Sequence, residues 1–458
     1  MLSSLRMRWP VADPVERLCW LYIMTIPLLL VPPSLSRVQL SEGVFLLTMV
    51  CFLWQLFRRQ RRLEVPRNLF GLCVGLYLVV SAISLVNSPA LGSSLLELGV
   101  IVYLVSVFLL FLNVIRTREQ LWAIAEVWLV GTALIVLIGF VGIALAFAGM
   151  TTRIAHAEFV NAYLPFRLPR VFSTMITAKL LSTYLVVSLS LAIARLQVET
   201  ALRVRKLILA LITGMVVTLI FTFSREWVSA IVALMVLWYC AGPNLDHSAL
   251  RIAGLSAVVV FFLVVQIISA FVLLDASSQT DRFSGQPINA RIIETYNPNE
   301  GIHRWHLSVD YIWADYLTLK WVAWTMLYEH PWIGTGLGTF HAYLQLRMTE
   351  GTLHRNFTRY AVPHSTIFGK AGETGLLGLG VLAALFVTWI VHLVNAVRGA
   401  TQISDRWLAA AFFAGVTGLL TNSLNIDLMN LRHLWTILAL GMGAQEVIRR
   451  FPPDVLRN

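Results

Sequence analysis

Long apolar runs separated by short polar connections dominate the chain. Most of the runs reach the ~17 to 25 residues that a helix needs to cross roughly 30 Å of hydrocarbon. We therefore predict an all-α polytopic membrane protein with about twelve transmembrane helices by this length criterion. The predicted spans are residues 18–31, 38–57, 69–87, 92–114, 121–148, 172–194, 207–223, 227–241, 252–274, 366–394, 407–424 and 434–447.

One long polar segment, residues 275–363, interrupts this pattern. It carries half of the histidines and is rich in Trp and Tyr. Within it, residues 303–329 have apolar positions at mixed helical spacing, which predicts one or two amphipathic helices lying on the bilayer surface. The chain therefore divides into spans at 1–274, a large loop at 275–363, and final spans with a basic tail at 364–458.

Composition excludes a soluble globule. With 58% hydrophobic and 13% charged residues and a mean hydropathy of +0.74, the chain has too little polar surface to cover 458 residues. The formal charge of +11 could suit nucleic acid, but the basic residues are dispersed between apolar segments and form no continuous stripe. All four cysteines lie inside apolar runs, so neither a disulfide framework nor a cysteine metal site is predicted.

Arginines between the spans predict the orientation. Basic residues cluster at 58–62, 116–118 and 195–206 and in the C-terminal tail, and such clusters belong in the cytoplasm. Both termini are then cytoplasmic. Counting spans from there places the 149–170 loop, the Ser224-Arg225 turn, the large loop and His364 on the outer side.

The stretch from Pro363 to Gly380 changes from a polar loop to a glycine-rich apolar segment, with His364 at the junction. Read as a helix beginning near Ser365, it places His364, Ala371, Gly375 and Gly378 within about 60° of one another. Glycines cost a helix about 1 kcal/mol each, so we expect a partner helix or a ligand to approach this face closely.

His364, Ser365, nine further residues, Gly375, two residues and Gly378 reproduce a pattern that resembles the signature of the superfamily of O-antigen ligases and O-antigen polymerases. The arrangement of spans and the long loop before the last three resemble the ligase branch. The resemblance implies a GT-C-like, metal-independent, inverting glycosyltransferase that works without a cofactor. Its implied location is the periplasmic face of the bacterial inner membrane.

His364 is the candidate general base. A histidine at a helix N-terminus and partly out of water is favoured as the neutral imidazole. The alternative is a histidine that satisfies a loop carbonyl at the membrane interface. The resemblance favours the base and adds Ser365, Gly375 and Gly378 as substrate-binding positions.

Four arginines are candidate ligands for phosphate. Arg225 lies where two apolar runs nearly touch and resembles the superfamily's Ser-Arg turn, although Glu226 stands where a small residue is usual; its alternative role is a topology anchor. Arg170 resembles a family arginine, although Ser173 replaces the family's glycine. Within the large loop, Arg291 and Arg304 are the candidates because they flank the start of the amphipathic segment.

Glu329–Phe340, EHPWIGTGLGTF, resembles a glycine-rich stretch of the superfamily. It follows no parallel strand, so it predicts a loop turning back towards the membrane and not a nucleotide cradle. No Asp-x-Asp pair and no convincing histidine set occurs, so we expect no metal. Guanidinium groups would then stabilise the leaving pyrophosphate.

The resemblance identifies the partners as a glycan linked to undecaprenyl pyrophosphate and the lipid A core as acceptor, which together complete lipopolysaccharide. Two alternatives remain open. The first is an O-antigen polymerase or O-oligosaccharyltransferase. The second is a lipid-linked glycan transporter, which should carry charges near the middle of its spans; His392 and Lys179 come nearest to that in this chain.

Overall fold

The computed structural model describes residues 13–28, 39–150, 152, 154–160, 168–224, 226–242, 319–349 and 362–450. The described part is an all-α membrane protein, with eight helices long and apolar enough to cross a bilayer. These are α2 (Leu40–Phe57), α3 (Leu69–Ser84) with a 3₁₀ turn at Leu85–Asn87, α4 (Leu91–Val114), α5 (Arg118–Phe147), α6 (Ala178–Val198), α7 (Leu202–Phe221), α13 (Thr366–Gly399) and α14 (Ile403–Thr421).

Three further predicted spans correspond to helices that are shorter or less apolar. They are α1 (Pro14–Thr25), α8 (Glu226–Ala241) and α15 (Arg432–Arg450). The predicted span at 252–274 lies outside the described residues. Length alone separates α8 from the eight, because its 16 residues are apolar but fall short of the thickness of the hydrocarbon core, whereas α1, with 12 residues, is both shorter and less apolar.

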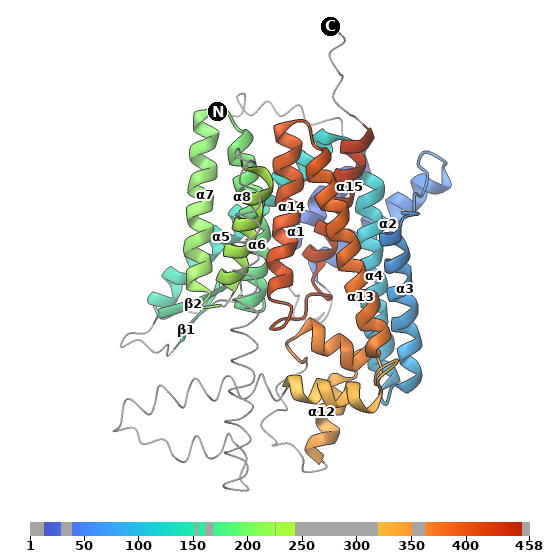
Figure 1. Cartoon of the computed structure of the whole chain (residues 1–458). Coiled ribbons are helices and arrows are strands. Elements are labelled where there is room, and N and C mark those ends of the chain that lie inside the picture. Colours follow the sequence, from blue (N-terminus) through green and yellow to red (C-terminus); the bar gives the residue numbers. More distant parts are fainter. Residues whose placement is uncertain are drawn as a thin grey trace.

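Ion pairs gather the basic connections at one end of the bundle, here called the arginine-rich end. Arg61 pairs with Asp13, Arg116 with Glu64 at 2.5 Å, Arg118 with Asp405 at 3.0 Å and Arg450 with Glu64 at 3.6 Å. The β-hairpin and α12 (Phe340–Thr349) lie towards the lower end of the bundle in Figure 1. Since arginine-rich connections favour the cytoplasm, we expect the hairpin end to be the outer one.

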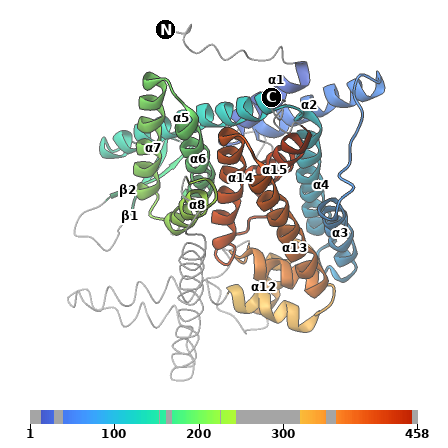
Figure 2. The ribbon, with the colours of Figure 1, turned by 45° about the horizontal axis from the view of Figure 1, so that its top comes forward.

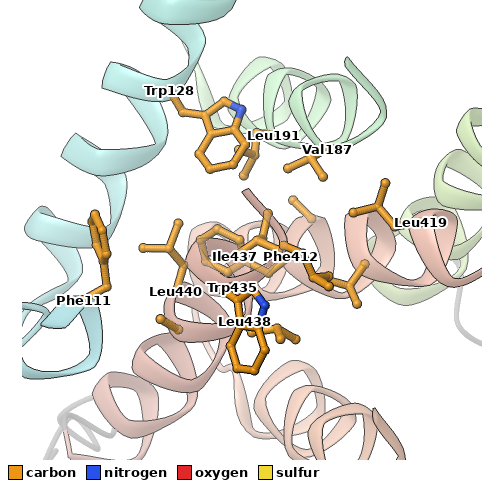
Figure 3. Close-up of a cluster of buried hydrophobic side chains, with 14 of the residues drawn as sticks. Phe111, Trp128, Val187, Leu191, Phe412, Leu419, Trp435, Ile437, Leu438 and Leu440 are labelled. Carbon is orange, nitrogen blue, oxygen red and sulfur yellow. The ribbon is translucent and has the colours of Figure 1, made fainter. Parts of the chain in front are cut away.

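The centre of the bundle is α14, which lies between α6 and α8 on one side and α15 on the other (Figure 2). Figure 3 shows the large apolar side chains that meet there, from α4, α5, α6, α14 and α15. Small residues permit the close packing: a methyl group on Gly418 would stand 2.6 Å from the Ser229 carbonyl oxygen of α8. This contact holds the start of α8 beside the end of α14.

A β-hairpin occupies much of the predicted 149–170 loop. Strands β1 (His156–Val160) and β2 (Leu168–Ser173) pair antiparallel. The predicted span at 172–194 therefore begins too early, since α6 starts only at Ala178. Ser173 takes a left-handed φ of 54° and ends the strand, and the Thr177 side chain caps the helix. Because apolar residues lie on both sides of this short strand, the hydropathy pattern does not show where the strand ends and α6 begins.

Part of the large loop packs on the beginning of α13. Residues 319–329 are helical, and with α12 they enclose a small apolar cluster built around Leu319, Val322, Met326 and Phe340. Trp321, Trp324 and Tyr328 lie on the exposed side of the same helix. The buried apolar face packs on protein and the exposed face is aromatic, so the location at the bilayer surface expected for 303–329 stays a prediction. Residues 303–318 lie outside the described residues.

Candidate functional site

His364 lies two residues before the start of α13 and has a strained backbone conformation. Its φ of 50° lies in the left-handed region, which costs a residue with a side chain roughly 1 kcal/mol or more. The next residue, Ser365, caps α13, because its hydroxyl accepts a hydrogen bond from the Phe368 amide at 3.2 Å. The imidazole is therefore held half-buried at the positive end of the helix dipole.

The loop between α14 and α15 fixes this helix start. The Thr366 amide donates to the carbonyl oxygens of Ser423 at 2.7 Å and Ile426 at 2.9 Å. The Ser365 hydroxyl donates to the Ser423 carbonyl at 3.3 Å, and the Thr366 hydroxyl donates to the Ile426 carbonyl at 2.7 Å. The Ser365 hydroxyl is thus hydrogen-bonded to both Phe368 and Ser423, so Ser365 positions His364.

The same loop reaches the Ser224-Arg225 turn. The Asn422 side-chain amide donates to a Glu226 carboxylate oxygen at 2.7 Å, and both side chains are buried. Asn422 immediately precedes Ser423, so a short path of contacts joins the turn to His364. The unusual Glu226 thereby gains a structural partner. Arg225 itself lies outside the described residues.

Arg170 comes to the turn from the other side. Its Nε donates to the Thr222 carbonyl oxygen at the end of α7, at 2.9 Å, and its guanidinium lies 5.6 Å from the centre of the Phe172 ring. Thr222 is three residues before Arg225. Strand β2 thus carries one predicted phosphate ligand to the turn that carries another. The other two, Arg291 and Arg304, lie outside the described residues.

Lys179, in the first turn of α6, is a member of this site that the sequence analysis did not assign to it. Burial lowers the pKa of His364 to about 4, and the positive charge of Lys179 contributes to the shift. The ammonium therefore lies within electrostatic reach of the imidazole. Its signal in the sequence was a lone lysine near the start of an apolar run.

Gly375 marks a break in α13, which corrects the prediction of one continuous glycine face. Its φ of 68° and ψ of −168° are not helical, so the two halves of the helix are offset. A methyl group there would stand 2.3 Å from the Trp332 carbonyl oxygen. The predicted close approach is real, but its partner is the loop at residues 331–336.

That loop satisfies the backbone groups that the break releases. The amides of Thr335 and Gly336 donate to the carbonyls of Gly372 and Glu373, and the amides of Leu376 and Leu377 donate to the carbonyls of Pro331 and Trp332. The EHPWIGTGLGTF segment thus turns back onto the membrane helix. Gly378 serves the same bend, since a methyl group there would meet the Thr374 hydroxyl at 1.9 Å.

A buried charge cluster follows on the same half-helix. The Lys370 ammonium, 2% exposed, lies 2.9 Å from a Glu373 carboxylate oxygen, 3.8 Å from Glu97 of α4 and 3.9 Å from Asp427. The Asn430 side-chain amide donates to Glu97 at 2.7 Å. A lysine and a glutamate three residues apart inside an apolar run were the available signal. The cluster ties α13 to α4 and to the loop that holds His364.

We expect Lys370→Met to destabilise the folded protein by about 3 to 5 kcal/mol, because it leaves buried carboxylates without their cation. The unfolding temperature in detergent, or the urea midpoint, measures this loss. Arg450→Met is the matched control. Arg450 pairs with Glu446 and Glu64 while 44% exposed, and such surface pairs contribute at most about 1 kcal/mol. Equal losses in the two variants would contradict the prediction.

No model of a known protein family matches the chain, and no curated protein matches it at a significant level.

Proposed function

We propose that the protein is an O-antigen ligase: a GT-C-like glycosyltransferase with twelve spans at the periplasmic face of the bacterial inner membrane. It moves a glycan from undecaprenyl pyrophosphate to the lipid A core. The observation that carries this proposal is the path of contacts from Arg170 through the 222–226 turn and Asn422 to Ser365 and His364. This path supports a base and phosphate-binding cations within one site at the outer end of the bundle.

The chemistry is a single displacement with inversion. An imidazole nitrogen of His364 takes the proton from the acceptor hydroxyl as the hydroxyl oxygen attacks the anomeric carbon. The bond from that carbon to the diphosphate oxygen breaks, and its electron pair leaves with the diphosphate. Arg170 and Arg225 stabilise the charge that grows there, and donors directed at a developing charge contribute roughly 3 to 4 kcal/mol each.

Purified protein with undecaprenyl-pyrophosphate glycan tests this proposal, in separate reactions with core lipid and with free glycan acceptor. Glycosylated core lipid is the expected product. Chain extension of the glycan alone would instead identify a polymerase. Movement of the intact lipid-linked glycan across a vesicle membrane, without transfer, would identify a transporter.

The pH dependence of transfer follows from the state of His364. Burial, with a smaller contribution from Lys179, lowers the pKa of this imidazole to about 4, so it is already neutral and able to accept a proton at pH 7. As the pH falls, the neutral fraction is lost only near pH 4. We expect kcat/KM to stay level from pH 8 down to about 5.5 and then to fall. An acidic limb centred near the ordinary histidine value of about 6.5 would contradict this.

A further inference from the structure

The beginning of α6 is held rigidly at the outer end of the bundle. The Ser173 hydroxyl donates to the Ile135 carbonyl at 2.6 Å, and the Thr174 hydroxyl donates to the Pro27 carbonyl at 2.6 Å. Thr177 then caps the helix by accepting a hydrogen bond from the Leu180 amide at 3.2 Å. Lys179 therefore leaves a fixed backbone, and its side chain is half-buried.

The first turns of α6, which carry Lys179, contact Thr222, and Arg170 contacts the same residue. One turn after Lys179, the Ser182 hydroxyl donates to the Thr222 hydroxyl at 3.0 Å, while the Thr222 carbonyl accepts from Arg170. On its other side, α6 packs along α14, which ends at Thr421, one residue before Asn422 and close to the start of α13. Lys179 thus lies one helix turn before the contact with Thr222 and within electrostatic reach of His364.

The described surroundings of Lys179 favour an anion. Helices α6, α8 and α13 all begin in the region around Lys179, and each presents the positive end of its dipole there. Arg170 and Lys179 supply two positive charges against the one negative charge of Glu226, whose carboxylate accepts a hydrogen bond from the neutral Asn422 side chain. The Ser224 hydroxyl, only 8% exposed, has no hydrogen-bond partner among the described residues. A bound phosphate oxygen would provide one.

We propose that the Lys179 ammonium binds the diphosphate of the lipid-linked donor next to His364. This inference rests on the proposed function and adds a cation that neither the sequence pattern nor the resemblance assigns. During transfer, the diphosphate gains negative charge as the bond to the anomeric carbon breaks, and a cation beside it stabilises the leaving group.

Lys179 also couples donor binding to the base. In the free protein its charge opposes protonation of His364. When the diphosphate occupies the site, its negative charge offsets the ammonium, and the imidazole becomes a stronger base at the moment when it must accept a proton. Among the described residues, the elements packed near His364 also carry Arg170 of β2, Glu226 of α8, Lys320 of the 319–329 helix, and Lys370, Glu373 and Asp427 on and beside α13. Lys370, Glu373 and Asp427 are paired within the Lys370 cluster.

The test uses the full-length protein in nanodiscs and the variants Lys179→Met and Lys179→Arg. We expect Lys179→Met to raise KM for the donor by about tenfold or more, the loss expected for one charged hydrogen bond. The acidic limb of kcat/KM should also move to higher pH, since a nearby like charge is gone. Lys179→Arg should retain most of both properties. Lys206→Met, at the arginine-rich end, is the matched control and should behave like the original protein.

Direct binding separates the sources of phosphate. Undecaprenyl pyrophosphate, undecaprenyl phosphate, inorganic pyrophosphate and phosphatidylglycerol vesicles are compared as competitors of a labelled donor. Preference for both diphosphates over the monophosphate, lost in Lys179→Met, supports the proposal. Equal competition by phosphatidylglycerol overturns it, because the site would then bind a phospholipid headgroup as well as it binds a diphosphate.

The two proposals fail in different ways. If the original protein transfers glycan and Lys179→Met matches it in KM and pH profile, Lys179 is no ligand although the enzyme assignment stands. If the original protein transfers nothing, yet binds pyrophosphate only when Lys179 is present, Lys179 remains a diphosphate ligand and the transferase assignment falls.

Discussion

His364→Ala should abolish glycan transfer while leaving a folded, membrane-inserted protein. Burial keeps the imidazole neutral at pH 7, and therefore able to accept a proton. General-base catalysis contributes about 10²- to 10⁴-fold in rate, so transfer should fall by at least that range. The fold should persist, because the start of α13 is held by the hydrogen bonds of Ser365 and Thr366, which the substitution leaves in place.

The measurement is ligation of radiolabelled glycan to core lipid, with the protein amount matched by chromatography in detergent. His341→Ala is the control, because His341 lies on α12 with its ring bonded to the exposed Gln345. We expect this control to transfer at close to the original rate. Normal ligation by His364→Ala would remove this histidine from the mechanism, whereas equal losses in both variants would point to damage in the loop region.

Hydropathy and charge predicted the general class of the fold well, because a bilayer imposes the same length and polarity on every span. The basic clusters at 58–62 and 116–118 indeed lie at one end of the described bundle. The number of spans was harder to predict. Helices such as α8 and α15 are shielded by neighbours, so they need less apolar length than the rule assumes, and α15 carries polar residues that face protein.

The candidate site was predictable only in part. Counting spans places His364 and the Ser224-Arg225 turn on the same side, but it gives no distance between them. The link is made by Asn422 and Ser423, which a single sequence presents as an ordinary polar turn. Lys179 was weighed as a charge in a span and not as a neighbour of His364, because its position depends on where strand β2 ends and α6 begins.

The glycines illustrate a different limit. Their number near His364 correctly signalled a close approach, because something must offset the helix penalty. The sequence could not say which residue leaves the helical conformation. The answer depends on Gly334 and Gly336, some forty residues earlier, whose left-handed φ values of 70° and 111° let the loop lie against the exposed carbonyls of α13.

Gly375→Ala should be the most damaging glycine replacement in α13. An L residue at φ 68° costs about 1 to 2 kcal/mol, and the new methyl group would overlap the Trp332 carbonyl, 2.3 Å away. Neither partner can yield easily, since both are backbone. Relief requires the 331–336 loop to move off the helix, which breaks up to four hydrogen bonds at about 1 kcal/mol each. We expect a loss of several kcal/mol.

Gly380→Ala is the natural comparison, because it lies five residues further along the same helix, with nothing within 4 Å of the added methyl group. It should stabilise the protein by up to about 1 kcal/mol through helix propensity. Thermal unfolding in nanodiscs gives both values, and protease cleavage within 331–338 reports whether the loop has detached. If Gly375→Ala unfolds at the same temperature as Gly380→Ala and its loop stays protected, α13 does not depend on this break. The loop would then not be what fixes the half-helix that begins at His364.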